Sequence, residues 1–393
     1  MTIAHAPTHD ELVRKASDLA PLLEKHAQWS DENRRLHDDV VDALADAGLF
    51  RLRNPARYGG FEASARTLVD VATELGRADG AVGWTASIYT IPAWMAGTFP
   101  DHVQDEVFAD PDVRICGTLS PSGSATPTAG GVVLNGRWGF VSGALHAQWQ
   151  EILAMAPTPD GGMQPIMALV PMSDLQIVDD WFTAGLRGSG SVTTLAQDVF
   201  VPEERTLPLI EILQQKYKSE ANASNPMWHT PLMPVTAAAT VGTLLGMAKG
   251  AMDAFLGRLP ERKITYTEYE TAGDAPVTHL QVAEAAIKTD QAEFHSHRIA
   301  DMLDTKTAGN LPWSVVERAR SRADVGAVSG LAKDAVDILS SASGGSSLYE
   351  SAAIQRINRN VQATNLHALI YPPTAMELYG RVLSGLEPNT LYV

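Results

Sequence analysis

The chain has 393 residues, enough for two to four domains, and its hydrophobic content of 45% supplies a large core. The formal net charge of −16 argues against a nucleic-acid partner, which requires a concentrated basic surface. A single cysteine, Cys116, excludes an intrachain disulfide, and the first residues lack the basic start and apolar run of a signal peptide. We therefore expect a cytoplasmic protein.

Residues 1–110 are predicted to form a helical domain, because apolar residues recur at spacings of three and four. Ser30 is expected to cap the second helix and Gly48 to end it. A later helix runs through Trp84 toward Trp94, and we expect Pro92 to interrupt it. The first apolar stripe consists of Leu12, Ala16, Leu19 and Leu23.

Residues 111–208 are predicted to form a β-domain, because short β-rich runs alternate there with turn signals. Asn135-Gly136 is one such signal and separates two of the runs. The even spacing favours an antiparallel barrel or sandwich, and we take the barrel as the prediction. The runs are 131–134, 138–141, 152–155, 166–170 and 192–201.

Residues 209–393 are predicted to form a C-terminal four-helix bundle from segments 232–256, 277–303, 313–342 and 350–383. The low-polarity run from Leu232 to Ala248 approaches the length of a membrane span. It is rich in alanine, glycine and threonine and meets Lys249, so a buried bundle helix is the better interpretation. No membrane partner is expected.

Several local strings give this order of domains a family resemblance. The order and the strings together resemble the acyl-CoA dehydrogenase superfamily over nearly the whole chain. The resemblance implies an α+β fold in which a flavin lies between the central β-domain and the two flanking helical domains. The strings are Tyr58-Gly59-Gly60, 135–138 (Asn-Gly-Arg-Trp), 185–191 (Gly-Leu-Arg-Gly-Ser-Gly-Ser), Val201-Pro202, Glu261-Arg262-Lys263, and Gly344-Gly345 preceding Arg359.

The general base of the dehydrogenases is missing from both of the places where the family keeps it. In the family, a glutamate follows an Arg-Asp pair by about nine residues; here the pair is Arg359-Asn360 and the later position is Ala368. The other location lies early in the bundle, but no carboxylate occurs between Glu220 and Asp253. Since alanine cannot accept a proton, the dehydrogenase mechanism lacks its base.

A histidine, His367, stands beside that vacant position. With Trp84, the turn 139–143 and His146, it makes the chain similar to the two-component flavin-dependent monooxygenases of this superfamily. The chain also lacks a nicotinamide site, because Gly188-Ser189-Gly190 leads into a strand-like run instead of a helix. This fits an oxygenase that receives its flavin from a separate NAD(P)H-dependent flavin reductase.

The resemblance implies a reaction and its cofactors. Reduced flavin, either FMN or FAD, would react with O2 to give a C4a-hydroperoxide that hydroxylates an aromatic or other electron-rich small molecule. Ser142 aligns with the hydroxyl residue that protects the flavin N5 proton, and His367 aligns with a histidine near the peroxide. His146 is a further catalytic candidate. Without the family, Ser142 is an ordinary turn serine and His367 an ordinary helical histidine.

The resemblance also assigns contacts with the flavin. Thr118 and Ser120 would contact its ring, and Trp84 would either line the flavin or substrate cavity or pack in the hydrophobic core. Arg262, in a homotetramer, would bind flavin phosphate across a subunit boundary or else pair with a nearby glutamate. Arg187 would bind the flavin or brace its own turn. Gly345 completes the predicted cofactor-binding set.

Three alternative functions stay open on the sequence. They are oxygenation of an amine nitrogen by the same flavin chemistry, an acyl-CoA dehydrogenase with a relocated base, and a non-catalytic binding module. The segment 88–94 lacks the histidine that holds the substrate phenol in related hydroxylases. We therefore expect a substrate that is larger or more apolar than a simple hydroxyphenyl acid, or one that is held differently. His295 and His297 point to different helix faces, and no metal site is predicted.

Overall fold

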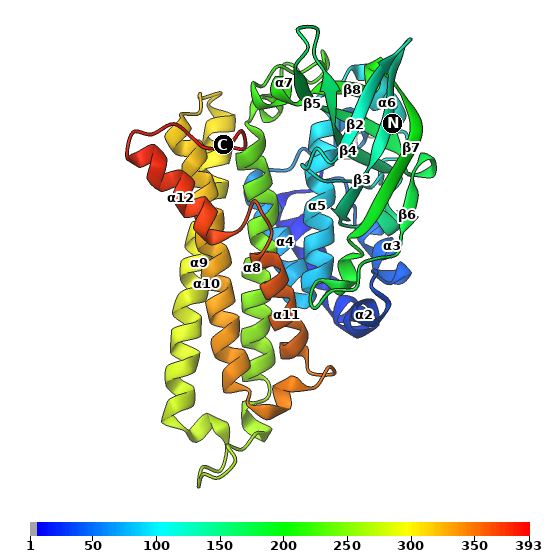
Figure 1. The fold of residues 1–393 in the computed structure, drawn as a ribbon. Helices are drawn as coiled ribbons and strands as arrows, with labels where there is room; N and C mark the ends of the chain where they lie inside the picture. Colours follow the sequence, from blue (N-terminus) through cyan, green and yellow to red (C-terminus); the bar gives the residue numbers. More distant parts are fainter. Residues whose placement is uncertain (1–5) are drawn as a thin grey trace.

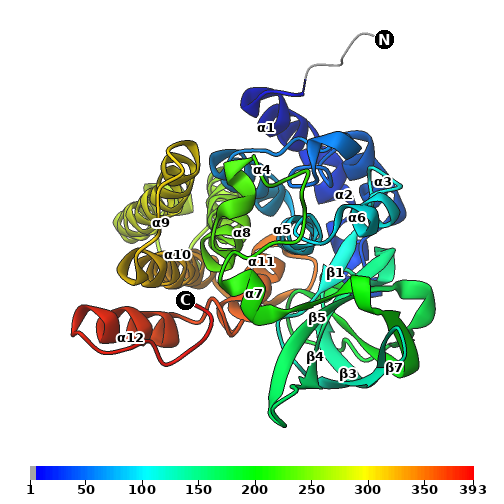
Figure 2. The same cartoon turned by 90° about the horizontal axis from the view of Figure 1, so that it is seen from above.

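The computed structural model describes residues 6–393. It places the N-terminal helices and the C-terminal helices beside each other, with the sheet packed against the N-terminal set (Figures 1 and 2). The N-terminal helices are α1 (His9–Asp18), α2 (Ala20–Asn33), α3 (Asp38–Asp46), α4 (Ala65–Ala78), α5 (Gly80–Ala96) and α6 (Asp101–Val107).

Tertiary contacts shift several of the predicted boundaries in this region. The first stripe is split between α1 and α2 at Leu19, because Pro21 begins a new helix. Ser30 lies inside α2, and α3 is capped by His37, whose Nδ1 accepts from the Asp39 amide. Pro92 does not interrupt α5, which is buried along almost all of its length, so packing offsets the lost hydrogen bond.

The strands form one open sheet, so the predicted closed barrel is wrong. Its path is β6-β7-β3-β2-β4-β5-β8, and β1 pairs with β4 off that path. Most pairings are antiparallel as predicted, but β1 and β2 both run parallel to β4. The strands are β1 (Ile115–Gly117), β2 (Gly123–Thr128), β3 (Gly131–Val141), β4 (Trp149–Pro157), β5 (Met163–Pro171), β6 (Gln176–Val178), β7 (Val192–Pro202) and β8 (Thr206–Pro208).

Asn135-Gly136 is not a hairpin turn but an irregularity inside β3. The register against β7 shifts between Leu134 and Gly136. The Asn135 side chain exchanges two hydrogen bonds with Asp198 of β7, at 3.0 and 2.9 Å. A partner from a strand distant in sequence therefore stabilises a β-bulge where the local sequence favours a turn.

The C-terminal part consists of the short α7 (Leu209–Leu213) and then α8 (Leu232–Leu256), α9 (Pro276–Ala308), α10 (Val315–Ala342), α11 (Ala353–Asn365) and α12 (Pro372–Leu383). The fourth predicted segment, 350–383, is therefore two helices. The break follows from Pro372-Pro373, which disfavour a helical residue before them. His367 lies in this break.

Helix α8 joins the C-terminal helices to the N-terminal ones. By length and composition it could cross a membrane, but 94% of its apolar window is buried inside the protein, as expected for a core helix. Its glycines lie against the α4 backbone: a Cβ on Gly242, Gly246 or Gly250 would come within 2.2–2.3 Å of an α4 carbonyl oxygen. The two helices can approach this closely only because these positions lack side chains.

Candidate active site

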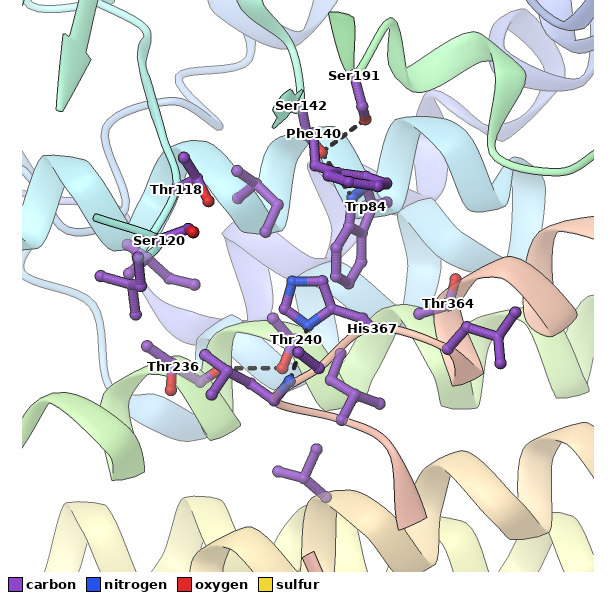
Figure 3. Close-up of a pocket in the computed structure, with 18 of the residues that line it drawn as sticks. Trp84, Thr118, Ser120, Phe140, Ser142, Ser191, Thr236, Thr240, Thr364 and His367 are labelled. Carbon is purple, nitrogen blue, oxygen red and sulfur yellow. Dashed lines mark hydrogen bonds between the residues drawn. The ribbon is translucent and has the colours of Figure 1, made fainter. Parts of the chain in front are cut away.

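A cavity of about 1080 Å³ lies between the sheet and the helices. Its walls come from α5, the loop after β1, the end of β3, α8, α10 and the break between α11 and α12. Figure 3 shows Ser142 and Ser191 on one side, and His367 lies between Trp84 and the threonines of α8. The cavity therefore forms where all three parts of the chain meet.

The residues predicted from sequence fall into two groups. Five of them line the cavity: Trp84, Thr118, Ser120, Ser142 and His367. Four of them do not: His146, Arg187, Arg262 and Gly345.

A chain of hydrogen bonds fixes the hydroxyl of Ser142. Ser189 Oγ donates to Leu186 O at 2.7 Å, so its one proton is used. Ser189 must then accept from Ser191, and Ser191 from Ser142, over two contacts of 2.7 Å. Trp84 Nε1 donates to Ser142 Oγ at 3.0 Å. The relay leaves Ser142 with its proton engaged and one oxygen lone pair free to accept another N–H.

His367 contributes a neutral hydrogen-bond donor to the cavity wall. Burial, and then the charge of Arg322, lower its pKa to about 4, although part of the ring is accessible from inside the cavity. Its Nδ1 accepts from the Leu369 amide at 3.3 Å, so the proton of the neutral ring resides on Nε2. The ring meets Trp84 edge to face with centroids 5.2 Å apart.

Phe140 stands where β3 bends into the turn that carries Ser142. Its φ of 61° is in the left-handed region, which costs a non-glycine residue about 1–3 kcal/mol. The ring is exposed and packs edge to face on Trp181, and both aromatic side chains line the cavity. Backbone strain is thus concentrated two residues before Ser142.

Arg187 braces the loop in which it lies. Its Nε donates to Asp31 O at 3.0 Å, which ties the loop to α2. The Asp31 carboxylate also pairs with Arg359 at 2.8 Å, and Arg359 does line the cavity. These contacts favour the bracing role of Arg187 over direct contact with a flavin.

His146 lies among Arg35, Asp38 and Arg114, outside the cavity. Burial first, and then Arg35, lower the pKa of its ring to about 4. Because the side chain does not reach the cavity, the structure separates it from Ser142 and His367.

Arg262 and Gly345 lie at the far end of the C-terminal helices. Arg262 donates to Ala342 O at 2.7 Å, at the end of α10. Arg322, on the cavity wall, precedes Ala342 by twenty residues in α10, so the two residues are about 30 Å apart along the helix axis. Arg262 therefore lies well away from this cavity.

Two buried ionisable residues in the cavity wall were missed by sequence reasoning. Glu151 on β4 is 1% exposed and Arg322 on α10 is 5% exposed. Glu151 is a charged residue inside an apolar strand, and this signal is visible in the sequence. Arg322 follows Arg318 and Arg320 in a charged stretch of α10, so the local sequence does not distinguish it.

The histidines considered for metal binding are engaged separately. His295 contacts Asp324 and His297 contacts Asp70, at 3.1 and 3.4 Å. Another group, His26, His37 and Asp39, brings its ligand atoms within 4.8 Å of one another between α2 and α3. The cap on α3 already occupies His37 Nδ1, as described above.

The chain matches known families along most of its length. Residues 7–106 match the acyl-CoA dehydrogenase N-terminal domain, and residues 237–372 match the acyl-CoA dehydrogenase C-terminal domain. The flavin-dependent monooxygenase oxygenase subunit HsaA of Rhodococcus jostii is 31% identical, over 95% of this chain and 98% of that protein. The FADH2-dependent resorcinol hydroxylase oxygenase component of a Rhizobium strain is 30% identical, over 99% of each chain.

Solved structures agree with this assignment. XiaF from Streptomyces, in complex with FADH2 and glycerol, superimposes with a TM-score of 0.90 at 29% identity and covers 97% of each chain. That similarity extends across the helices and the sheet. This chain belongs to the acyl-CoA dehydrogenase superfamily, in its group of two-component flavin-dependent monooxygenase oxygenase subunits.

Proposed function

We propose that this protein is the oxygenase component that uses reduced flavin and O2 to hydroxylate an aromatic small molecule. One observation carries the proposal: Ser142, with its acceptor lone pair, and the neutral donor His367 line the same cavity. The cavity suits a flavin ring, because its wall is largely apolar and Ser142 offers the acceptor that a flavin N5–H needs.

When bound, reduced flavin supplies the electrons that activate O2 and delivers one oxygen atom to the substrate. The residues of the chain position and protect that chemistry. Ser142 would accept a hydrogen bond from the flavin N5–H and so hold that proton in place, and His367 would donate from Nε2 to an oxygen atom in the cavity. Apolar wall residues such as Ile91 and Met95 exclude the water that would remove that proton.

Two carboxylates line the cavity and are candidates for a relocated dehydrogenase base: Glu377, which is exposed and accepts from Asn389 at 3.1 Å, and the buried Glu151. Burial raises its pKa to about 8, so at neutral pH it carries a proton instead of accepting one. Ala368, at the position of the missing glutamate, is exposed and without a proton acceptor. The cavity therefore favours oxygenation over abstraction of a proton next to a thioester.

The assembly follows from the same proposal. A separate NAD(P)H-dependent flavin reductase would supply the reduced flavin in the cytoplasm. A homotetramer would bring Arg262 and Gly345 of one subunit to the flavin of another. In that arrangement Arg262 would increase the affinity for FAD, which has a longer phosphate-bearing tail, more than the affinity for FMN.

Rapid mixing tests the function. The protein with reduced FMN or FAD, mixed with O2, should show a transient absorbing species before oxidised flavin appears. With a reductase and labelled dioxygen, an aromatic product should carry one labelled oxygen atom. Ser142→Ala should shorten the lifetime of the transient and divert oxygen to hydrogen peroxide. The absence of both the transient and the labelled product refutes the proposal.

Two further outcomes would assign other chemistry. A label on a substrate nitrogen would identify amine oxygenation. A protein that purifies with tightly held FAD and reduces an acceptor with an acyl thioester would be a dehydrogenase.

A further inference from the structure

Two buried ionisable groups of the cavity wall, Arg322 and Glu151, have no charged partner. Neither forms a salt bridge within residues 6–393, and each side chain has a buried atom without a hydrogen-bond partner there, Arg322 Nε and Glu151 Oε2. Buried polar groups are normally paired, and an unpaired buried charge is destabilising. Both residues line the same cavity, so a ligand bound there is the candidate partner for these side chains.

The C-terminal residues hold Arg322 in the wall. Its Nη1 donates to Tyr392 O at 2.7 Å, and the Tyr392 hydroxyl donates to Leu119 O at 2.6 Å. This is the one hydrogen bond that the guanidinium makes within the described residues, although it has five donor hydrogens. Arg322 is also close enough to His367 for its charge to lower the pKa of that ring. An anion bound to Arg322 would thus lie near His367, the residue proposed to donate a hydrogen bond to oxygen.

Glu151 stands in the opposite wall, on strand β4, beside Gly117 of β1. At neutral pH its carboxyl group is protonated, so it can donate one hydrogen bond and accept another. The ionisable groups that interact with it are Cys116 and Tyr392, and burial raises the pKa of both. Neither carries a charge that would offset ionisation of Glu151.

We propose that Arg322 and Glu151 bind two oxygen substituents of an aromatic substrate, an anionic oxygen on Arg322 and a hydroxyl or carbonyl oxygen on Glu151. The anionic oxygen is a phenolate or a carboxylate, both of which match the forked donors of a guanidinium. The proposal rests on the proposed monooxygenase function, because the cavity is then the place where substrate meets flavin. It makes Arg322 and Glu151 the residues that select oxygenated aromatics over plain hydrocarbons.

Substrate affinity without oxygen tests the role of Arg322. The enzyme loaded with reduced FMN is titrated anaerobically with resorcinol, p-hydroxyphenylacetate, indole-3-acetate and neutral indole. Wild type should bind at least one of the first three compounds more tightly than it binds indole. Tighter binding of resorcinol alone would identify the group on Arg322 as a phenolate, and tighter binding of indole-3-acetate would identify it as a carboxylate. Arg322→Met should weaken that binding about tenfold or more and leave indole unchanged, and Arg322→Lys should restore part of it.

Arg318→Met is the matched control, since Arg318 is one turn earlier on α10 and outside the cavity lining. Equal losses for indole and the oxygenated probes, or wild-type binding of indole as tight as theirs, would overturn the proposal. The reaction of the loaded enzyme with O2 in the absence of any substrate tests the proposed function separately. A normal transient together with unselective binding therefore rejects this inference alone.

A pH series tests Glu151. Wild-type affinity for the anionic probe should fall as Glu151 ionises near pH 8, because a second negative charge then enters the cavity. Glu151→Gln has the same shape but cannot ionise, so its affinity should stay level from about pH 7 to 9. A fall of equal size in Glu151→Gln would remove Glu151 from substrate binding.

Discussion

The hydrogen-bond relay makes Ser191 a determinant of which flavin redox state binds. Ser191 accepts the Ser142 proton, so Ser142 presents a lone pair to the cavity. Reduced flavin carries an N–H at N5 and can donate to that lone pair. Oxidised flavin has only a lone pair at N5, and two lone pairs repel. The relay should therefore favour reduced flavin. In Ser191→Ala the Ser142 hydroxyl should be free either to donate to N5 of oxidised flavin or to accept from N5–H of reduced flavin.

The size of the effect follows from the bonds exchanged. A neutral hydrogen bond contributes about 0.5–1.5 kcal/mol net, and a buried acceptor left without a donor costs about 1–3 kcal/mol. Ser191→Ala should thus reduce the preference for reduced over oxidised flavin by about 1–3 kcal/mol, or about 5- to 150-fold in the ratio of Kd values. Most of the change should come from tighter binding of the oxidised form.

Tryptophan fluorescence provides the assay, because Trp84 donates to Ser142 in the cavity wall. Oxidised FMN is titrated in air and reduced FMN anaerobically, for wild type and for Ser191→Ala. Ser296→Ala is the control, since it removes one buried hydroxyl hydrogen bond from α9, outside the cavity lining. A ratio that stays within about twofold of wild type in a folded Ser191→Ala protein would refute the relay as the cause of redox preference.

Three further variants test burial and packing. Because the folded-state pKa of Glu151 is raised, wild type should lose up to about 5 kcal/mol of stability as pH rises from 4.5 to about 8. Glu151→Gln cannot ionise and should not show this loss, which urea unfolding across that pH range measures. His367→Gln should change stability at acidic pH, because the lowered pKa of His367 makes wild type lose up to about 3 kcal/mol of folding stability as pH falls from 6.5 to about 4. An equal dependence of stability on pH in wild type and variant would contradict the burial of this ring. Gly246→Ala should destabilise by about 1–3 kcal/mol or more, because its Cβ would lie 2.3 Å from Thr73 O; an unchanged melting temperature would show that α4 and α8 can separate freely.

Local sequence determined much of the helical framework, and its resemblance to a family indicated the class of chemistry. The apolar run from Leu232 gave α8 with both of its ends, because helix periodicity and flanking prolines act over a few residues. The absence of a carboxylate at Ala368, beside His367, indicated that proton abstraction was not the reaction. Ser142 and His367 could be singled out because the strings around them resemble those of a family.

The tertiary structure decided what depends on partners distant in the chain. Strand β2 pairs with β4 in parallel and leaves the sheet open, and Asp198 turns Asn135-Gly136 into a bulge. Ser191 acquires its role only when β7 lies beside the turn of Ser142. Burial cannot be read from neighbours in sequence, so only the folded chain shows that His146 lies outside the cavity. For the same reason, only the fold brings Glu151 and Arg322 into the cavity wall without charged partners.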